Sequence, residues 1–477
     1  MRLLFGVVLV LLAALSLAPR RTLCKNCNII VLSLDTVGAN HLPCYGYARN
    51  TAPNLCAFAD KNVRFQHAYS NASWTLPSDV SMLTSLYPSF HGMMDYADYE
   101  RRLSSEIPTL PELLKDNGYT TYFGIPPNDR AFPSDVYSRG IDHVIPIRPG
   151  QEEERDLAAA LETFRASAAS GEKTFLFLHS YAAHGPYLTE NRQKMFTDEA
   201  IPTVPLRWDD VYGNFSEDFY RYLLDELGNV VGKPQATIDR DFYEQLKNAP
   251  TLAAAQTLAR SRLAELESYY TEYYYFAKIN LSDPRQVEYI KALYDQKIYE
   301  LDSWVGRVFL PLLEDPALKD NTMVLITSEH GEEFLEHGRI THETLYDTNV
   351  KVPFILSLPG ATPLVSDVPV QGVDVTPMIL DMVGVSRERQ RFQGGQMSQN
   401  RLLVAESQTA KTVRTKQWKL FLTRSQNEWI PYELYDIQTD PMEQDNVLLK
   451  HFDVAKTLLR QHERYENVWQ WRLRLGT

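Results

Sequence analysis

Asn28-Ile29-Ile30-Val31-Leu32-Ser33-Leu34 is an almost continuous run of β-branched and other apolar residues. A short run of this kind is typical of a strand that is buried on both faces of a parallel sheet. The run ends at Asp35-Thr36. Because strand carboxyl ends in open α/β sheets face the ligand crevice, and because an unpaired buried charge is costly, Asp35 is a candidate functional residue.

Two later runs repeat this arrangement. Thr174–Leu178 predicts a second buried strand, and the segment that follows it carries His184. Residues 321–328 predict a third buried strand, which leads into Glu329 and His330. Three strands that each lead into carboxylate or imidazole residues predict one convergent site.

Helical patterns alternate with these strands along the chain. Helices are expected at residues 52–61, 107–118, 157–170, 286–313 and 373–383, and further strands at 63–69, 119–124 and 350–358. This alternation indicates a doubly wound α/β core.

Two segments depart from the alternating pattern. Residues 195–284 are polar and rich in tyrosine, and they predict a helical insertion over the core. Residues 418–422 and 432–436 alternate in the manner of a small antiparallel sheet, which a helix at 453–472 would cover. We therefore expect a core domain over residues 24–400 and a small C-terminal α+β subdomain over residues 401–477.

The stretch from Ser73 to Pro88 predicts a loop that leads directly into a helix. Pro77 and Ser78 suit a first helical turn, and the apolar residues after them keep helical spacing. Thr75 would lie at the N-terminal end of this helix, where free backbone N–H groups and the helix dipole favour an anion. Its hydroxyl either attacks such an anion or only caps the helix.

Composition narrows the class of protein and of partner. The chain has 477 residues, 44% of them hydrophobic, so it can bury a substantial core. Its net charge of -13 argues against a nucleic-acid partner, because such partners need a basic face.

The N-terminal segment predicts export. Residues 3–18 form an uncharged apolar run behind Arg2, typical of a signal peptide or a short membrane anchor over residues 1–23. We therefore expect a periplasmic, secreted or lumenal protein, with membrane association if the segment is retained. An exported protein permits disulfides among its four cysteines, and disulfides or idle thiols are favoured over a zinc site.

The candidate residues have the chemistry of a metal site. Asp35, Glu329 and His330 are oxygen and nitrogen donors of the type that hold a divalent cation, and the acidic set favours calcium, magnesium or manganese. A cation beside Thr75 would lower the pKa of its hydroxyl and polarise a bound ester. His184 and His342 are candidates to donate to the ester oxygens or to protonate a leaving group.

In this order the motifs resemble the sulfatase family of the alkaline phosphatase superfamily. The resemblance runs from about Cys27 to Val447, apart from the 195–284 insertion. The motifs that carry it are Asp35-Thr36, His41-Leu42, Tyr45-Gly46-Tyr47, Pro77-Ser78, Leu83-Thr84, Tyr87-Pro88, His184-Gly185-Pro186-Tyr187, Thr327-Ser328-Glu329-His330-Gly331-Glu332, Leu345-Tyr346-Asp347, Val352-Pro353, Val373-Asp374 with Pro377, Leu434-Tyr435-Asp436 and Asp440-Pro441.

The resemblance implies a fold, a reaction and a set of roles. The fold would be an α/β sandwich around a central mixed, mostly parallel sheet, with a small C-terminal subdomain. The reaction would be hydrolysis of a sulfate ester, or of a phosphate or phosphonate ester, with one divalent cation beside the nucleophile. By position, Thr75 matches the nucleophile; Asp35, Glu329 and His330 match metal ligands; His184 and His342 fall near the ester-binding histidine and lysine. Calcium is the first expectation for the cation, with manganese, magnesium or zinc as alternatives.

The chain also departs from the family pattern. Sulfatases proper carry a Cys/Ser-x-Pro-Ser-Arg signature whose first residue is oxidised to formylglycine, whereas this chain has Thr75-Leu76-Pro77-Ser78-Asp79. Threonine cannot give that aldehyde, so no formylglycine is expected. Asp79 replaces the arginine and brings a negative charge near an anionic substrate.

Three functional hypotheses follow from these residues. In the first, Thr75 attacks the ester directly and forms a threonine ester, as in phosphatases and phosphoethanolamine-type transferases of the superfamily. In the second, a water molecule activated by the metal attacks and Thr75 positions the ester. In the third, the site is degenerate and the protein is a binding or scaffold protein. The expected partner is a small-molecule, glycan or lipid ester of sulfate or phosphate.

Overall fold

The computed structural model describes residues 24–94, 102–127, 131–150, 152–187, 279–386, 392–425 and 428–475, with isolated residues between 196 and 276. The expected N-terminal signal or anchor at 1–23 lies outside the described residues, as does nearly all of the expected insertion at 195–284. Both remain predictions.

The described core contains an eight-stranded sheet in the order β11-β2-β10-β7-β1-β6-β4-β5. Its strands are β1 (Asn28–Leu34), β2 (Val63–Phe65), β4 (Tyr119–Ile125), β5 (His143–Pro146), β6 (Lys173–Ser180), β7 (Thr322–Thr327), β10 (Phe354–Ser357) and β11 (Leu364–Ser366). β1 lies between β6 and β7 and runs parallel to both, while β10 is antiparallel to both of its neighbours. The expectation of a mixed, mostly parallel sheet is confirmed.

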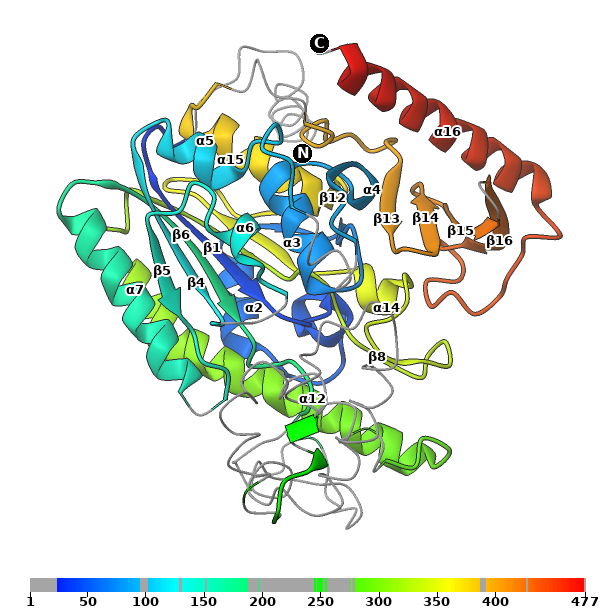
Figure 1. Ribbon diagram of the computed structural model, residues 1–477, viewed down its shortest axis with the longest axis horizontal. Coiled ribbons are helices and arrows are strands. Elements are labelled where there is room, and N and C mark those ends of the chain that lie inside the picture. Colours follow the sequence, from blue (N-terminus) through cyan, green and yellow to red (C-terminus); the bar gives the residue numbers. More distant parts are fainter. Residues whose placement is uncertain are drawn as a thin grey trace, which may run out of the picture.

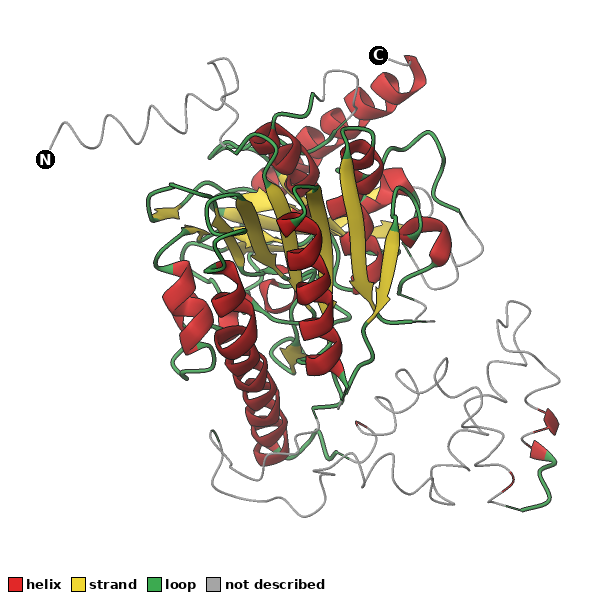
Figure 2. Ribbon diagram, turned by 90° about the vertical axis from the view of Figure 1, so that its left-hand side faces the viewer, coloured by secondary structure: helices red, strands yellow, loops and turns green. Residues whose placement is uncertain are grey.

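The strand β1 is buried along its whole length because helices cover both faces of the sheet (Figures 1 and 2). Ile30 and Leu32 belong to a core formed with α2 (Pro53–Ala59), α7 (Glu153–Ala169) and α12 (Pro284–Trp304). On the other face, Ile29 and Val31 belong to a core formed with α3 (Thr75–Thr84), α5 (Leu110–Lys115) and α15 (Val375–Val383). Alternate residues of one strand therefore contribute to two cores, as its continuous apolar sequence predicts.

The C-terminal sheet is antiparallel in the order β13-β14-β15-β16. Its strands are β13 (Leu403–Glu406), β14 (Ala410–Arg414), β15 (Trp418–Ser425) and β16 (Glu428–Asp436). The long helix α16 (Phe452–Leu475) lies across this sheet, as the red ribbon in Figure 1 shows. Val413 and Leu420 of the sheet pack with Leu458 of the helix in a small separate core. The small C-terminal subdomain is therefore present, and two of its strands extend beyond the segments that alternation predicted.

Two strand predictions need correction. The strand expected at 63–69 is two strands, because the chain leaves the large sheet after β2 and β3 (Ala68–Tyr69) pairs instead with β12 (Val370–Gln371). Only the second half of 350–358 is a strand. Val350 ends the short helix α14 (Asp347–Val350), and β10 begins directly after Pro353, which has no N–H to give to a sheet.

The remaining elements are short or continue longer ones. The helix expected over 286–313 passes from α12 through a π-helical turn at Val305–Phe309 into α13 (Leu310–Leu313). Short elements close the connections: α4 (Pro88–His91), α6 (Ser134–Tyr137), β8 (Glu333–Phe334), β9 (Ile340–Thr341) and 3-10 turns at Ala39–His41, Pro43–Tyr45 and Gly372–Asp374.

The cysteines are paired as disulfides, Cys24 with Cys27 and Cys44 with Cys56. Disulfides were one of the two alternatives favoured over a zinc site. None of the helices in the described part of the chain has both the length and the apolar character needed to cross a bilayer.

Candidate active site

The carboxyl ends of three adjacent parallel strands bring together Asp35, His179 and Glu329. Asp35 follows β1, His179 is the penultimate residue of β6, and Glu329 lies two residues beyond β7. One potential ligand atom from each lies within 4.8 Å of the others, and all three residues are buried. Nε2 of His179 is 3.1 Å from Oδ2 of Asp35, and Ser33 donates its hydroxyl to Oε2 of Glu329 at 2.9 Å. Each carboxylate is thus held by one of its oxygens.

The other oxygens face His330. Nε2 of His330 lies 3.6 Å from Oδ1 of Asp35 and 3.6 Å from Oε1 of Glu329. These three atoms are buried and none has a hydrogen-bond partner in the described residues. Nδ1 of His330 is 3.0 Å from the carbonyl oxygen of Gly331, and because a carbonyl only accepts, Nδ1 carries the proton. The lone pair on Nε2 therefore points to two bare carboxylate oxygens, an arrangement in which a cation would satisfy all three atoms.

The electrostatics of the cluster agree with this interpretation. Burial raises the pKa of Asp35 and holds the pKa of Glu329 well above its ordinary value. Burial also holds the pKa of His330 well below its ordinary value. The protein alone does not stabilise two carboxylates in this space, and a divalent cation would compensate their charge.

Thr75 lies on the helix face that is turned toward the cluster. It is the first residue of α3, and Trp74 takes the N-cap position, where no side-chain capping hydrogen bond is made among the described residues. Thr75 shares a helix face with Ser78 and Asp79, which follow it by three and four residues. Ser78 lines a small cavity together with Glu329. Burial raises the pKa of Asp79, and the nearby charges of Glu329 and Asp35 raise it further. The predicted position of Thr75 at a helix N-terminus is confirmed, whereas its role remains a prediction.

Asp79 occupies the place where the family signature has arginine. It is fully buried, and the hydroxyl of Tyr137 donates to its Oδ2 at 3.1 Å. Burial holds the pKa of this carboxyl well above its ordinary value. Asp79 is therefore a buried residue that is held by a hydrogen bond from Tyr137.

His184 and His342 lie beside His330. The ring of His342 is 4.4 Å from the ring of His330 and 5.5 Å from the ring of His184. His184 comes from the loop after β6, and His342 directly follows β9. The structure thus brings five of the six predicted residues, Asp35, His184, Glu329, His330 and His342, into one cluster, with the face of α3 that carries Thr75 against it.

Two residues of this cluster were not among the predicted site residues. His179 lies inside β6, and its position directly after the apolar run 174–178 is the signal that could have indicated it. Glu332 lies in the acidic segment after β7 and accepts a hydrogen bond from Nδ1 of His342 at 2.8 Å. No spacing in the sequence predicts the contact between Glu332 and His342, because β8 and β9 lie between the two residues and must form first.

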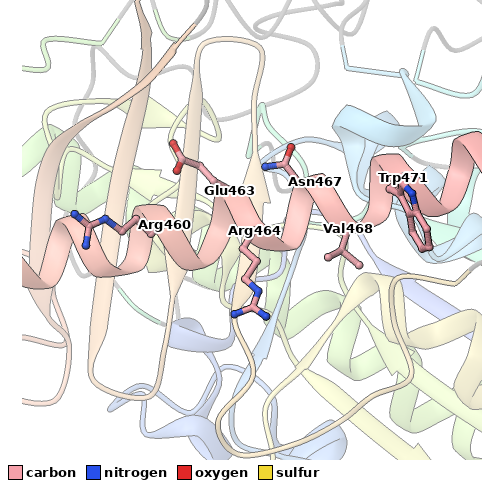
Figure 3. A pocket seen from close by; sticks show the side chains of 6 residues that line it. All are labelled: Arg460, Glu463, Arg464, Asn467, Val468 and Trp471. Atoms are coloured by element: carbon pink, nitrogen blue, oxygen red, sulfur yellow. The ribbon is translucent and has the colours of Figure 1, made fainter.

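A separate hollow lies on the surface of α16 (Figure 3). It is lined by Arg460, Glu463, Arg464, Asn467, Val468 and Trp471. None of the strand-end residues lines it, so the hollow is distinct from the cluster described above.

The cluster combines the parts that hydrolysis of an anionic ester requires. Two carboxylates and two imidazoles, those of His179 and His330, offer donor atoms for one cation, a hydroxyl lies at a helix N-terminus, and the imidazoles of His184 and His342 border these donors. Helix N-termini favour anions, and imidazoles exchange protons near neutral pH.

Comparisons with known proteins agree with this chemistry. The sequence model of the sulfatase family matches residues 27–385. Iduronate 2-sulfatase of Mus musculus is 25% identical over 380 residues, which cover 70% of this chain and 60% of that protein. The chain thus spans about 60% of the length of this curated relative.

Solved structures share the fold. The structure of BT4656 in complex with its substrate D-glucosamine-2-N,6-O-disulfate superposes with a TM-score of 0.61 at 20% identity, covering 93% of this chain and 99% of that chain. The phosphonate monoester hydrolase of Agrobacterium radiobacter superposes with a TM-score of 0.58 at 16% identity, covering 93% and 96%.

Proposed function

The chain belongs to the sulfatase family, and from this premise we propose that it is a metal-dependent hydrolase of sulfate or phosphate esters with Thr75 as nucleophile. One observation carries the proposal. Oδ1 of Asp35, Oε1 of Glu329 and Nε2 of His330 are buried, unpartnered in the described residues and turned toward one another. Buried polar groups left unsatisfied are rare and costly, so a bound group is their natural partner.

We propose that Asp35, Glu329 and His330 hold one divalent cation, with His179 orienting Asp35 through the 3.1 Å contact. When bound, the cation would lower the pKa of the Thr75 hydroxyl and polarise the ester. Calcium is the cation expected from the family resemblance, but it takes six to eight oxygen ligands, whereas this set includes an imidazole. Imidazole and carboxylate together suit manganese or zinc, so these are the first candidates.

With its pKa lowered by the cation, the Thr75 hydroxyl would lose its proton to water, and its oxygen would attack the sulfur or phosphorus of the ester. The new bond joins that oxygen to the sulfuryl or phosphoryl group, the bond to the leaving oxygen breaks with its electron pair, and the leaving oxygen takes up a proton. His342 supplies that proton, and His184 binds the anionic oxygens. Water then hydrolyses the threonine ester and restores the hydroxyl. No formylglycine is needed in this sequence of steps.

The substrate is proposed from the relatives. The solved structure of BT4656 holds a sulfated glucosamine, so a sulfated glycan is the first candidate. The similarity to a phosphonate monoester hydrolase makes a phosphate or phosphonate ester the second candidate. Transfer of the group from Thr75 to an alcohol rather than to water is the transferase alternative.

The N-terminal segment and the disulfides support a proposed location. Disulfides form and persist in oxidising compartments, and both pairs lie within residues 24–56. We propose an exported protein, and whether residues 1–23 are cleaved or retained as an anchor is decided by the N-terminal sequence of the mature chain.

A substrate and metal panel tests the proposed function. Aryl sulfate, phosphate monoester, phosphodiester and phosphonate substrates are measured with calcium, magnesium, manganese and zinc. We expect turnover in at least one combination, and we expect Thr75→Ala to lower kcat by about a thousandfold or more. Thr84→Ala is the matched control, because Thr84 lies at the other end of α3 and donates its hydroxyl to the carbonyl of Val80. Lack of turnover in every combination would favour a binding or scaffold protein.

A further inference from the structure

Three of the four histidines of the site, His184, His330 and His342, are anchored through Nδ1. Nδ1 of His184 is 2.7 Å from the carbonyl oxygen of Gly185, and Nδ1 of His330 is 3.0 Å from that of Gly331. Nδ1 of His342 is 2.8 Å from Oε1 of Glu332. Carbonyl and carboxylate oxygens only accept, so Nδ1 carries a proton in each ring.

His342 differs from the other two because a side chain anchors it. Glu332 is fully buried, and its second oxygen, Oε2, accepts the hydroxyl of Tyr187. Tyr187 is fully buried as well, with its ring 5.4 Å from Tyr294 and 5.8 Å from Phe334. The carboxylate is therefore fixed at both oxygens, on one side by the partly buried His342 and on the other by Tyr187, which is packed in the core.

The neighbouring Glu333 is equally buried but has other partners. Its Oε1 accepts the backbone N–H of His337 at 2.8 Å, and its Oε2 accepts the hydroxyl of Thr344 at 2.5 Å. These bonds tie the loop between β8 and α14 together. Two consecutive buried carboxylates thus make different contacts, one to a histidine of the site and one within a loop.

We propose that Glu332 is a positioning residue that fixes the ring of His342 so that Nε2 faces the leaving oxygen of the ester. The inference rests on the proposed function, in which His342 protonates that oxygen. His342 acts in its doubly protonated form: the proton passes from Nε2 to the leaving oxygen, the electron pair of the broken bond stays on that oxygen, and the neutral ring that remains keeps its Nδ1–H bonded to Glu332. Tyr187 holds Glu332 in turn.

Kinetics with graded leaving groups separate this role from a structural one. General acid catalysis matters most for esters whose leaving oxygen is strongly basic. Removing a group that orients a functional histidine costs about 10- to 100-fold. We therefore expect Glu332→Gln to lower kcat by this factor for weakly acidic phenol and alkyl leaving groups and to leave nitrophenyl esters nearly unchanged. Tyr187→Phe is expected to give a smaller change of the same kind.

Glu333→Gln is the matched control. It is expected to lower the melting temperature without changing the ratio of kcat between poor and good leaving groups. An equal loss on all leaving groups in Glu332→Gln, or the same change of ratio in Glu333→Gln, would overturn the inference.

A spectroscopic readout does not depend on turnover. The ¹⁵N spectrum of histidine-labelled protein distinguishes the two neutral tautomers of each ring, and His342→Gln identifies the signal of His342. The neutral ring of His342 should carry its proton on Nδ1, and Glu332→Gln should populate the other tautomer while Glu333→Gln does not. An unchanged tautomer in Glu332→Gln would contradict the positioning role. If the unmutated chain turned over no ester, the proposed function would fail while this spectrum still decided the role of Glu332.

Discussion

Asp79 shows how one residue can mark both membership of a family and departure from it. Its position in the signature is that of an arginine, yet it is a buried carboxyl whose Oδ2 accepts the hydroxyl of Tyr137. Its Oδ1 has no hydrogen-bond partner in the described residues. An arginine here would bring a cation beside the proposed metal ligands, whereas burial holds the pKa of the Asp79 carboxyl well above its ordinary value and so favours its neutral form.

A double-mutant cycle tests this account of Asp79. Asp79→Asn keeps a neutral group of the same shape, so the free energy of unfolding should change by less than about 1 kcal/mol. Tyr137→Phe leaves a buried oxygen unpaired and should cost about 1–3 kcal/mol. Urea unfolding of both single variants and the double variant measures the coupling. A destabilisation by Asp79→Asn larger than that by Tyr137→Phe would show that Asp79 is ionised.

His91 makes a pH-dependent contribution to stability. It is buried, its Nδ1 accepts the backbone N–H of Met93 at 3.1 Å, and its Nε2 is 3.1 Å from the hydroxyl of Ser81. Burial lowers the pKa of His91 to about 3. Because Nδ1 already accepts a hydrogen bond, a second proton would break that bond.

The sign of the pH effect follows from this pKa. The unfolded chain binds a proton at His91 below about pH 6.5, whereas the folded chain does so only near pH 3. The contribution of neutral His91 to the free energy of unfolding is fully present above about pH 6.5. It falls by up to about 1.4 kcal/mol per pH unit as the pH decreases toward 3. His91→Asn should flatten this part of the curve of unfolding free energy against pH. Parallel curves for the two proteins would contradict the account.

At the scale of elements, a buried ion-pair network fastens α16 to the C-terminal sheet. Lys411 of β14 is 2% exposed at its side chain, and its Nζ lies 2.9 Å from Oε1 of Glu406 and pairs with Glu466 of α16. Burial alone would raise the pKa of Glu466, but the imidazole of His462, whose Nε2 lies 3.2 Å from Oε1, and the charge of Lys411 outweigh it and lower the pKa to about 2. The helix α16 is thus bound to the C-terminal sheet by ion pairs as well as by apolar packing.

Lys411→Met should release this helix. The change leaves Glu406 and Glu466 without their shared cation, and breaking a buried pair in this way costs about 3–5 kcal/mol. Limited proteolysis should cut α16 faster, and the midpoint of urea unfolding should fall. Lys450→Met is the control, because Lys450 and Asp445 are about 70% exposed at 3.8 Å and their pair contributes little. Equal effects of the two substitutions would refute the network.

The same scale shows what local patterns predict. The buried strands were recognised because continuous apolar runs report burial on both faces, as in β1 and β7. Helix starts were less well placed. α5 begins at Leu110 rather than Ile107, because Thr109 and Glu112 form a capping box that fixes the first turn. Pairing across the chain, such as β3 with β12, depends on tertiary contacts that no local pattern reports.

At the scale of the whole molecule, the site joins segments that are far apart in the sequence. Asp35, Glu329 and His330 could be predicted because each follows a buried strand, and parallel strands bring their carboxyl ends together. His179 and Glu332 were missed. His179 lies within the strand itself, and the pairing of Glu332 with His342 exists only once β8, β9 and the loop after them have formed.

Removal of the proposed cation should therefore lower the stability of the folded protein. Without it, Oδ1 of Asp35, directly after β1, and the buried atoms Oε1 of Glu329 and Nε2 of His330, in the loop after β7, have no hydrogen-bond partner in the described residues. A cation at one hundred times its dissociation constant should stabilise the folded state by about 2.7 kcal/mol. Melting temperatures with chelator and with added manganese or zinc measure this difference. The double variant Asp35→Asn, Glu329→Gln should not respond to the metal, and a response equal to that of the unmutated chain would place the cation elsewhere.

The central claim is that Thr75 forms a covalent ester next to this metal set. The most direct measurement is the mass of the Thr75 peptide after the protein, its metal and an activated ester substrate are mixed and quenched in acid within the first turnover. We predict that this peptide gains one sulfuryl or phosphoryl group and that Thr75→Ala abolishes the gain while Thr84→Ala does not. Turnover with no modified threonine, or modification at any other residue, would contradict the claim.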